Sequence, residues 1–239
     1  MIYLIILAGG TGQRMHNLQL PKQFMVLQGE SLICRSVEAI LKGTEVDQVV
    51  IAIHPSWHDY TIKLIADRNW SNITTIIDGG ETRLQSVENA LQSIYHSETA
   101  GKDMVLIHDS VRPFVSKKVV KMLLETLQNG AEAVSPAIQE VDSMFEIIDG
   151  MKVNSMPQRQ NLYRGQTPEG FRVATIYNSI KALTLQQRRQ NTGTAQICME
   201  AGVEIRAIEG DRENVKITTP ADIKMANAML QYGFSVDED

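Results

Sequence analysis

The sequence has little cysteine and no long hydrophobic run. Its 239 residues include two cysteines, Cys34 and Cys198, which lie far apart and have no CxxC pair or histidine at metal-ligand spacing. This composition excludes a disulfide framework and gives no sign of a zinc site. The apolar opening MIYLIILAGG spans about 10 residues and lacks a basic leader, so it predicts a buried strand and neither a signal peptide nor a membrane span. We therefore expect a cytoplasmic protein with reduced thiols.

An excess of positive charge is also missing. Lys and Arg number 23 against 28 Asp and Glu, which gives a formal net charge of −5. A surface with this balance repels polyanions unless basic groups gather locally, which argues against nucleic acid as a partner. The sequence shows no internal repeat, low-complexity tract or linker, and 43% of it is hydrophobic. This content is enough for a full core, so we expect one domain over residues 1–239.

The order of β-rich and helical segments predicts an α/β fold. Four apolar runs show little alternation, as strands covered on both faces do, and they span residues 2–7, 49–53, 73–77 and 104–107. Helical stretches lie between them at residues 31–42, 57–67 and 83–95. This alternation is typical of a mostly parallel, twisted sheet flanked by helices, in which active sites lie beyond the carboxyl ends of the strands.

The pattern changes after residue 115. A helix at 117–129 and a strand at 133–137 are followed by short alternating pieces around 142–153, which Asp149-Gly150 interrupts. Asp-Gly between such pieces predicts a hairpin. We expect it to form a β-arm inserted at about 138–163, and a projecting arm generally packs on a partner, so we predict a homodimer. The remaining segments predict helices at 173–183, 194–201 and from 219, and strands at 204–208 and 215–217.

The first chemical motif is LAGGTGQRM at residues 7–15, followed by LPKQF at 20–24. Glycines directly after a buried strand leave backbone N–H groups free to face an anion. Arg14 and Lys22 bring two cations to the same loop. The spacing is neither that of the P-loop nor GxGxxG. We interpret the segment as a phosphate cradle; the alternative is an ordinary glycine turn with solvated basic residues.

Two further motifs follow strand ends. In DGGETRLQS, residues 78–86, Gly79 and Gly80 allow a flat ring to approach the backbone and Ser86 could read its edge, although a simple helix cap explains the pattern equally well. In HDSVRPF, residues 108–114, Asp109 ends a buried strand near the phosphate loop, where a carboxylate suits Mg²⁺. Arg112 could orient Asp109 or hold the loop, and His108 is more simply explained as a partly buried structural residue than as a base.

Six motifs together carry a resemblance over almost the whole chain: LAGGTGQRM, LPKQF, DGGETRLQSV, HDSVRPF, RGQTPEGF and ENVKITTPADI. In order and spacing the sequence resembles the CTP-dependent polyol-phosphate cytidylyltransferases, which include ribitol-5-phosphate cytidylyltransferase and 2-C-methyl-D-erythritol 4-phosphate cytidylyltransferase. The resemblance implies a Rossmann-like nucleotidyltransferase fold, a dimer formed through the β-arm, and Mg²⁺-dependent attack of a substrate phosphate on the α-phosphorus of CTP.

The resemblance also implies roles for residues at matching positions. The catalytic cations would be Arg14, Lys22, Arg159 and Lys216, with Arg159 reaching over from the partner's arm. The CTP-binding residues would be Leu7, Ala8, Gly9, Gly10, Thr11, Gly12, Gly80, Glu81, Arg83 and Ser86. The polyol phosphate would contact Asp109, Ser143, Arg159, Thr167 and Thr192, and Asp109 would also hold the metal. In-line transfer between two anions needs such cations, because they neutralise charge that builds up at the α-phosphate.

One position departs from the family pattern. Gly193 follows Thr192 where the family usually carries Asp, which removes an acceptor for substrate hydroxyls. The motifs favour D-ribitol 5-phosphate as the substrate and CDP-ribitol as the product. The first alternative is 2-C-methyl-D-erythritol 4-phosphate, in non-mevalonate isoprenoid synthesis. A second alternative is a CTP-binding homologue with weakened catalysis. An NAD(P)-linked oxidoreductase would need a GxGxxG fingerprint that the sequence lacks.

Overall fold

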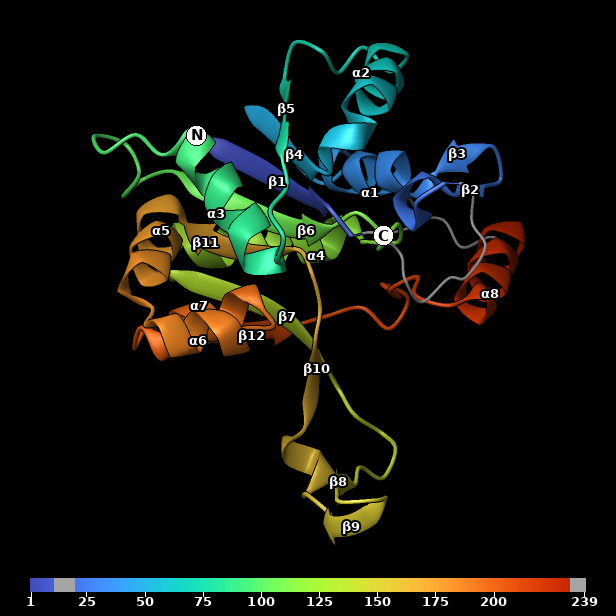
Figure 1. Cartoon of the computed structure of the whole chain (residues 1–239), viewed down its shortest axis with the longest axis vertical. Helices are drawn as coiled ribbons and strands as arrows, with labels where there is room; N and C mark the ends of the chain where they lie inside the picture. The colour runs from blue at the N-terminus through green and yellow to red at the C-terminus, as the bar shows by residue number, and fades with distance from the viewer. Residues whose placement is uncertain (11–19, 233–239) are drawn as a thin grey trace.

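A central sheet with helices on both faces forms the body of the protein, and a slender hairpin projects from it (Figure 1). The structure is a computed structural model that describes residues 1–10 and 20–232. The predicted site residues Thr11, Gly12 and Arg14 lie outside the described residues.

The parallel half of the sheet has β1 (Ile2–Ala8) at its centre. Its neighbours are β4 (Gln48–Ile53) and β6 (Met104–Asp109), and β5 (Thr74–Asp78) lies outside β4. All these pairings are parallel, in register from Tyr3 opposite Gln48 and from Ile2 opposite Met104. The four predicted strands and their parallel arrangement are therefore confirmed.

The other half of the sheet is mixed. Antiparallel β11 (Glu169–Arg172) lies between β6 and β7 (Ala133–Gln139). Strand β7 also pairs antiparallel with β10 (Tyr163–Gly165) and parallel with β12 (Ile205–Glu209). Strands β10 and β11 were not predicted, because three or four residues give too short a pattern to recognise.

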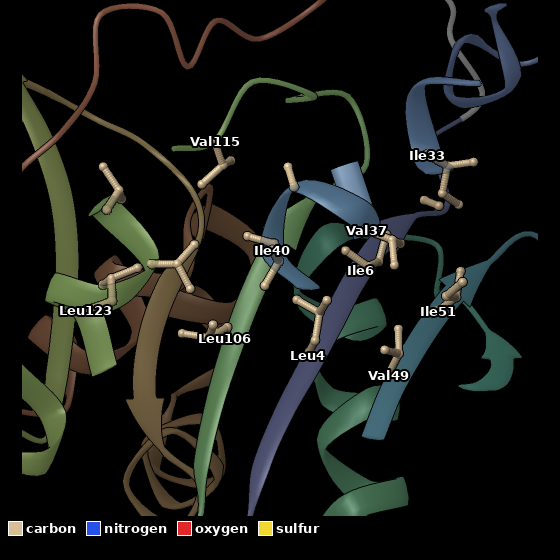
Figure 2. Close-up of a cluster of buried hydrophobic side chains, with 14 of the residues drawn as sticks. Leu4, Ile6, Ile33, Val37, Ile40, Val49, Ile51, Leu106, Val115 and Leu123 are labelled. Carbon is tan, nitrogen blue, oxygen red and sulfur yellow. The ribbon is translucent and has the colours of Figure 1, made fainter. Parts of the chain in front are cut away.

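Alternate side chains of the strands enter two separate cores. Leu4 and Ile6 of β1 face one core, which is covered by α1 (Leu32–Leu41), α2 (His58–Ala66) and α4 (Lys117–Gln128) (Figure 2). Tyr3 and Ile5 face the other core, which is covered by α3 (Arg83–Ile94), α5 (Val173–Ala182) and α7 (Thr194–Glu200). Burial on both faces explains why the central strands read as continuous apolar runs.

The C-terminal helix packs away from both cores. Short strands β2 (Val26–Leu27) and β3 (Glu30–Ser31) form a separate ribbon, and α8 (Pro220–Gln231) packs near it through a small cluster that includes Leu27, Phe114, Ile217 and Ala226. Helix α6 (Leu185–Gln190) follows α5. Within the described residues, three 3₁₀ turns complete the secondary structure: η1 (Lys22–Phe24), η2 (Pro55–Trp57) and η3 (Arg159–Asn161).

The hairpin predicted at Asp149-Gly150 is present. Strands β8 (Glu146–Ile148) and β9 (Lys152–Ser155) pair antiparallel, and the turn between them has positive φ at Asp149, Gly150 and Met151. Asp and Gly suit this left-handed backbone. The hairpin lies at the far end of the arm in Figure 1. The dimer formed through the arm stays a prediction. So does the arrangement of one domain over residues 1–239 with the arm inserted at about 138–163.

The predicted strand at residues 215–217 is wrong. Within the described residues this segment forms neither a helix nor a strand. The N–H of Ile217 donates to the carbonyl of Val111 at 2.9 Å, and the segment then leads directly into α8. The apolar residues Val215 and Ile217 belong to or pack against the small cluster under α8, which is why their alternation resembled a strand.

Candidate active site

A cavity of about 230 Å³ opens at the carboxyl ends of β1 and β6, beside the N-terminus of α3. Parallel α/β sheets place ligands at this edge. The structure brings together here the predicted site residues Leu7, Gly9, Gly10, Lys22, Gly80, Glu81, Arg83, Ser86, Asp109 and Lys216. Gln23, Thr82, Ser110 and Val111 complete the lining and were not predicted.

The loop after β1 forms one wall. The Gln23 amide donates to the carbonyl of Ala8 at 2.7 Å, which ties the η1 turn and its Lys22 to the end of the strand. Ala8 is buried and its carbonyl is used in this contact, so it supports the wall from behind. A Cβ built on Gly9 would lie 3.6 Å from Ser86 Oγ, so the first loop lies close to the start of α3.

The loop before α3 forms the opposite wall. Thr82 caps the helix by accepting from the N–H of Gln85 at 3.1 Å. Ser86 Oγ accepts from the N–H of Gly80 at 2.9 Å and donates to the carbonyl of Thr82 at 3.0 Å. The motif therefore contains the helix cap given as the alternative explanation, although Glu81 precedes the cap and does not lie in the first turn. The same bonds hold Gly80 and Ser86 at the cavity surface.

Asp109 is the electrostatic centre of the site. Lys216 Nζ lies 2.8 Å from its Oδ2, and nitrogens of Arg83 and Arg112 lie 3.7 Å and 3.8 Å from its carboxylate. Burial alone would raise the pKa of Asp109, but Arg83, Lys216 and Arg112 hold it well below its usual range. The carboxylate is therefore ionised, and the predicted role of Arg112 in orienting it agrees with this geometry.

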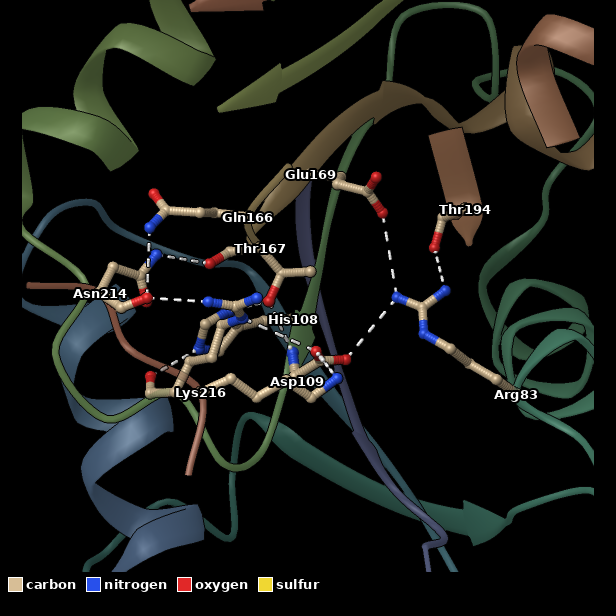
Figure 3. A network of polar contacts seen from close by, with 10 residues as sticks. Arg83, His108, Asp109, Gln166, Thr167, Glu169, Thr194, Asn214 and Lys216 are labelled. Carbon is tan, nitrogen blue, oxygen red and sulfur yellow. Dashed lines mark hydrogen bonds and ion pairs between the residues drawn. The ribbon is translucent and has the colours of Figure 1, made fainter. Parts of the chain in front are cut away.

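Arg83 spans the gap between two carboxylates (Figure 3). Its Nη1 donates to Thr194 Oγ1, and its Nη2 lies 3.9 Å from Glu169 Oε2 as well as near Asp109. Glu169 is buried in β11 and accepts from the N–H of Ala195 at 3.2 Å. Burial raises the pKa of Glu169, and Arg83 opposes that rise. Sequence reasoning missed Glu169 and Thr194, because Arg83 meets them only through the fold.

His108 and Thr167 fix the backbone of Asp109 through a chain of hydrogen bonds. His108 is fully buried, with Nε2 3.0 Å from the carbonyl of Arg112 and Nδ1 3.0 Å from Thr167 Oγ1. A carbonyl only accepts, so Nε2 carries the proton and Nδ1 accepts from Thr167. Thr167 Oγ1 in turn accepts from the N–H of Asp109 at 3.1 Å. Thr167 thus holds the backbone of Asp109, and its predicted contact with the substrate stays a prediction. His108 has the structural role expected.

The remaining predicted residues lie elsewhere in the chain. Ser143 and Arg159 are exposed on the arm, where Arg159 donates to the carbonyl of Val141 at 3.0 Å. Thr192 is exposed before α7, with its N–H donating to Gln196 Oε1 at 3.1 Å. The structure leaves these three predicted contacts untested.

The described residues contain no cluster of three or more His, Cys, Asp or Glu side chains that could hold a metal ion. Two carboxylates line the cavity, those of Glu81 and Asp109, and Asp109 is the buried one. This donor set still suits Mg²⁺, which is commonly bound by one or two carboxylates together with substrate phosphates and water.

Comparison with known proteins decides the family. The family model described as IspD, 2-C-methyl-D-erythritol 4-phosphate cytidylyltransferase, matches residues 2–232. The chain belongs to the IspD family. It is a nucleotidyltransferase, specifically a CTP-dependent cytidylyltransferase, as the sequence resemblance implied.

Solved structures agree with the IspD assignment. The 4-diphosphocytidyl-2C-methyl-D-erythritol synthase of Anaerococcus prevotii superposes with a TM-score of 0.81 at 26% identity, covering 96% of each chain. The Francisella tularensis 2-C-methyl-D-erythritol 4-phosphate cytidylyltransferase gives 0.79 at 25% identity, over 95% of this chain and 98% of that one. The Thermus thermophilus enzyme, at 24% identity and 0.73, supports the fold alone. The α/β nucleotidyltransferase fold is confirmed.

The expected preference for ribitol 5-phosphate finds no support in these comparisons. The IspD family and its solved members favour the first alternative, the methylerythritol phosphate. Motif similarity near the reacting centre could not separate the two substrates, because both are polyol phosphates joined to the same nucleotide. Across residues 1–10 and 20–232, no helix has both the length and the apolar composition needed to cross a bilayer.

Proposed function

We propose that this chain transfers CMP from CTP to 2-C-methyl-D-erythritol 4-phosphate. The products are 4-diphosphocytidyl-2C-methyl-D-erythritol and pyrophosphate. The observation that carries the proposal is the IspD match over residues 2–232, together with a cavity that gathers Lys22, Arg83 and Lys216 around Asp109.

The chemistry requires binding and charge neutralisation more than a covalent nucleophile. An oxygen of the methylerythritol phosphate attacks the α-phosphorus of CTP, and the bond from that phosphorus to the bridging oxygen breaks to release pyrophosphate. Lys22 and Lys216 stabilise charge on the transferring phosphate, and the glycine loop after β1 binds the triphosphate through its N–H groups. The loop at Gly80 to Ser86 binds the cytidine. Arg14, outside the described residues, completes the proposed cations.

Asp109 is the residue that would hold a divalent cation. When bound, Mg²⁺ would neutralise phosphate charge and help pyrophosphate leave. Lys216 contacts the same carboxylate at 2.8 Å, so it keeps Asp109 ionised and oriented. Arg112 fixes the other side of Asp109.

We also propose that the working enzyme is a homodimer and that Arg159 completes the partner's site. The arm exposes large apolar side chains, including Phe145, Ile147, Met151 and Val153. A two-stranded hairpin is marginal in water on its own, so such side chains favour a packing partner. The Arg159 guanidinium can bind a phosphate through paired donors.

A pyrophosphate-release assay tests the substrate. CTP and Mg²⁺ are supplied with 2-C-methyl-D-erythritol 4-phosphate, with D-ribitol 5-phosphate, or with no acceptor. We expect the methylerythritol phosphate to give the highest kcat/KM, by roughly 100-fold over ribitol phosphate, a ratio that lost hydrogen bonds can produce. A ribitol phosphate preference would reverse the assignment. CTP binding without turnover on either acceptor would indicate a nucleotide-binding homologue.

A further inference from the structure

Lys216 lies on an irregular segment, so neither a helix nor a strand fixes its backbone. Residues 210–219 connect β12 to α8 and form neither a helix nor a strand. Lys216 nevertheless lines the cavity and reaches Asp109 at 2.8 Å. A long, flexible side chain on an irregular segment needs its backbone fixed elsewhere.

The side-chain amide of Gln166 fixes this backbone through a pair of hydrogen bonds like those between neighbouring strands. Its Nε2 donates to the carbonyl of Asp211 at 2.6 Å, and its Oε1 accepts from the N–H of Asp211 at 3.0 Å. The same Nε2 lies 3.3 Å from the carbonyl of Asn214. The Gln166 side chain is buried, and its own N–H donates to the carbonyl of Pro136 in β7. One side-chain amide therefore ties the irregular segment to the sheet.

Asn214 extends this clamp to within two residues of Lys216. Asn214 is fully buried, and its Nδ2 donates to the carbonyl of Thr167 at 2.9 Å. Its own carbonyl accepts from Arg112 Nη1 at 2.8 Å. These contacts connect Gln166 and Thr167 on one segment with Lys216 on the other, and Figure 3 shows them converging beside Asp109.

The chain makes room for this clamp at Gly210. A Cβ on Gly210 would lie 2.4 Å from Gln166 Oε1 and 3.2 Å from a methyl of Ile138. The N–H of Gly210 donates to the carbonyl of Ala137 at 3.0 Å. A side chain at position 210 would thus displace the amide of Gln166 from Asp211.

We infer that Gln166 is a positioning residue that sets the place of Lys216 in the active site. The inference rests on the catalytic role proposed for Lys216. Removing the amide leaves the half-buried N–H and carbonyl of Asp211 without this partner, so the segment shifts to satisfy them. A shift of a fraction of an ångström at a transferring phosphate is enough to lower turnover, because catalysis by a cation depends on its fixed position.

A double-mutant cycle tests the inference. Gln166→Met keeps the length of the side chain and removes its three side-chain hydrogen bonds, two to Asp211 and one to Asn214. Gln48→Met is the matched control, since Gln48 begins β4 at the end of the strand away from the cavity and bonds Thr75 of β5. We expect Gln166→Met to lower kcat roughly tenfold with KM for CTP changed less than about twofold. In a Lys216→Ala background the same change should alter kcat less than about twofold, because its effect passes through Lys216.

The outcomes separate this inference from the proposed function. If Lys216→Ala lowers kcat while Gln166→Met leaves it at the wild-type value, or if the two losses multiply in the double variant, Gln166 does not act through Lys216. If Lys216→Ala retains wild-type kcat, the catalytic role of Lys216 fails and the inference fails with it. Should Gln166→Met not fold, Gly210→Ala displaces the same amide and must show the same dependence on Lys216.

Discussion

At the scale of single residues, the site places a carboxylate that is ionised near neutral pH beside an imidazole that is neutral there. Asp109 is ionised because Arg83, Lys216 and Arg112 outweigh the effect of burial on its pKa. Burial lowers the pKa of the adjacent His108 to about 4, so its imidazole is neutral near neutral pH. The neutral ring can accept from Thr167, and this hydrogen bond fixes the hydroxyl that receives the N–H of Asp109.

The neutral state of His108 makes stability depend on pH. The pKa of His108 is about 4 in the folded protein, against about 6.5 in an unfolded chain, so the unfolded chain binds more protons between these values. Stability therefore falls as the pH drops through this window. From pH 7.5 to pH 5 we expect His108 to contribute a loss of about 2 kcal/mol in the free energy of unfolding. The depressed pKa of Asp109 adds a loss of the same sign only at lower pH.

Urea unfolding at the two pH values measures this contribution. His108→Gln keeps a donor toward Arg112 and removes the titrating group, so the difference between pH 7.5 and pH 5 should shrink. Equal pH dependence in wild type and His108→Gln would contradict a neutral buried imidazole.

Lys22 carries the clearest single-residue prediction for activity. It lines the cavity, and the amide of Gln23 ties its turn to the end of β1. Lys22→Ala should lower kcat roughly 100-fold, as losing one fixed charge at a transition state does, with the melting temperature unchanged. Lys121→Ala, exposed on α4, is the control and should be neutral. Wild-type turnover in Lys22→Ala would refute the role.

At the scale of elements, residues at the start of α3 both cap the helix and line the cavity. Gln85 folds back over Gly80, where its Oε1 accepts from the N–H of Glu81 at 2.9 Å. A Cβ on Gly80 would lie 2.4 Å from the Gln85 side chain. A flat ring could approach the backbone at Gly80 only if no side chain projects there. The packing of Gln85 against Gly80 also requires a residue without a side chain.

Gly80→Ala should therefore weaken CTP binding. The added methyl must push Gln85 aside, which frees the N–H of Glu81 and moves the loop that lines the cavity. We expect KM for CTP to rise roughly tenfold, equivalent to about 1.4 kcal/mol. Gly101→Ala is the matched control, because a Cβ there meets open space. Steady-state kinetics and a melting curve for each variant measure the effect; an unchanged KM in Gly80→Ala would separate this loop from the nucleotide.

The sequence predicted elements well where burial is uniform and poorly where elements are short. Strands β1, β4 and β6 read correctly because both their faces are covered, and β5 was found although none of its residues is fully buried. Strands β10 and β11 were missed because three or four residues give too short a pattern to recognise. The site shows a different limit. The predicted cavity residues all lie on motifs, whereas Glu169 and Gln166, although they belong to the RGQTPEGF motif, contact Arg83 and Asp211 only in the folded chain.

At the scale of the whole molecule, a net charge of −5 coexists with a cationic pocket. Lys22, Arg83 and Lys216 come from distant parts of the chain and meet at one sheet edge. Acidic residues elsewhere set the overall sign of the charge. The charge of the chain thus disfavours large polyanions and still allows a small triphosphate to bind.

Heterodimers can test the proposal that Arg159, on the arm of one chain, completes the site of the partner chain. If Arg159 completes the partner's site, a heterodimer of Arg159→Ala with Lys216→Ala contains one intact site, made of Lys216 from the first chain and Arg159 from the second. Two affinity tags isolate this species after co-expression. We expect about half of the wild-type turnover per dimer, whereas each variant homodimer has both sites damaged.

The reciprocal heterodimer is the control. Wild type paired with a chain that carries both Arg159→Ala and Lys216→Ala should be nearly inactive, because each site then lacks one of the two residues. If Arg159 instead served its own chain, the two heterodimers would exchange results: the double-variant pair would keep half the activity and the separate-variant pair would lose it. Failure to recover any doubly tagged species would contradict the dimer itself.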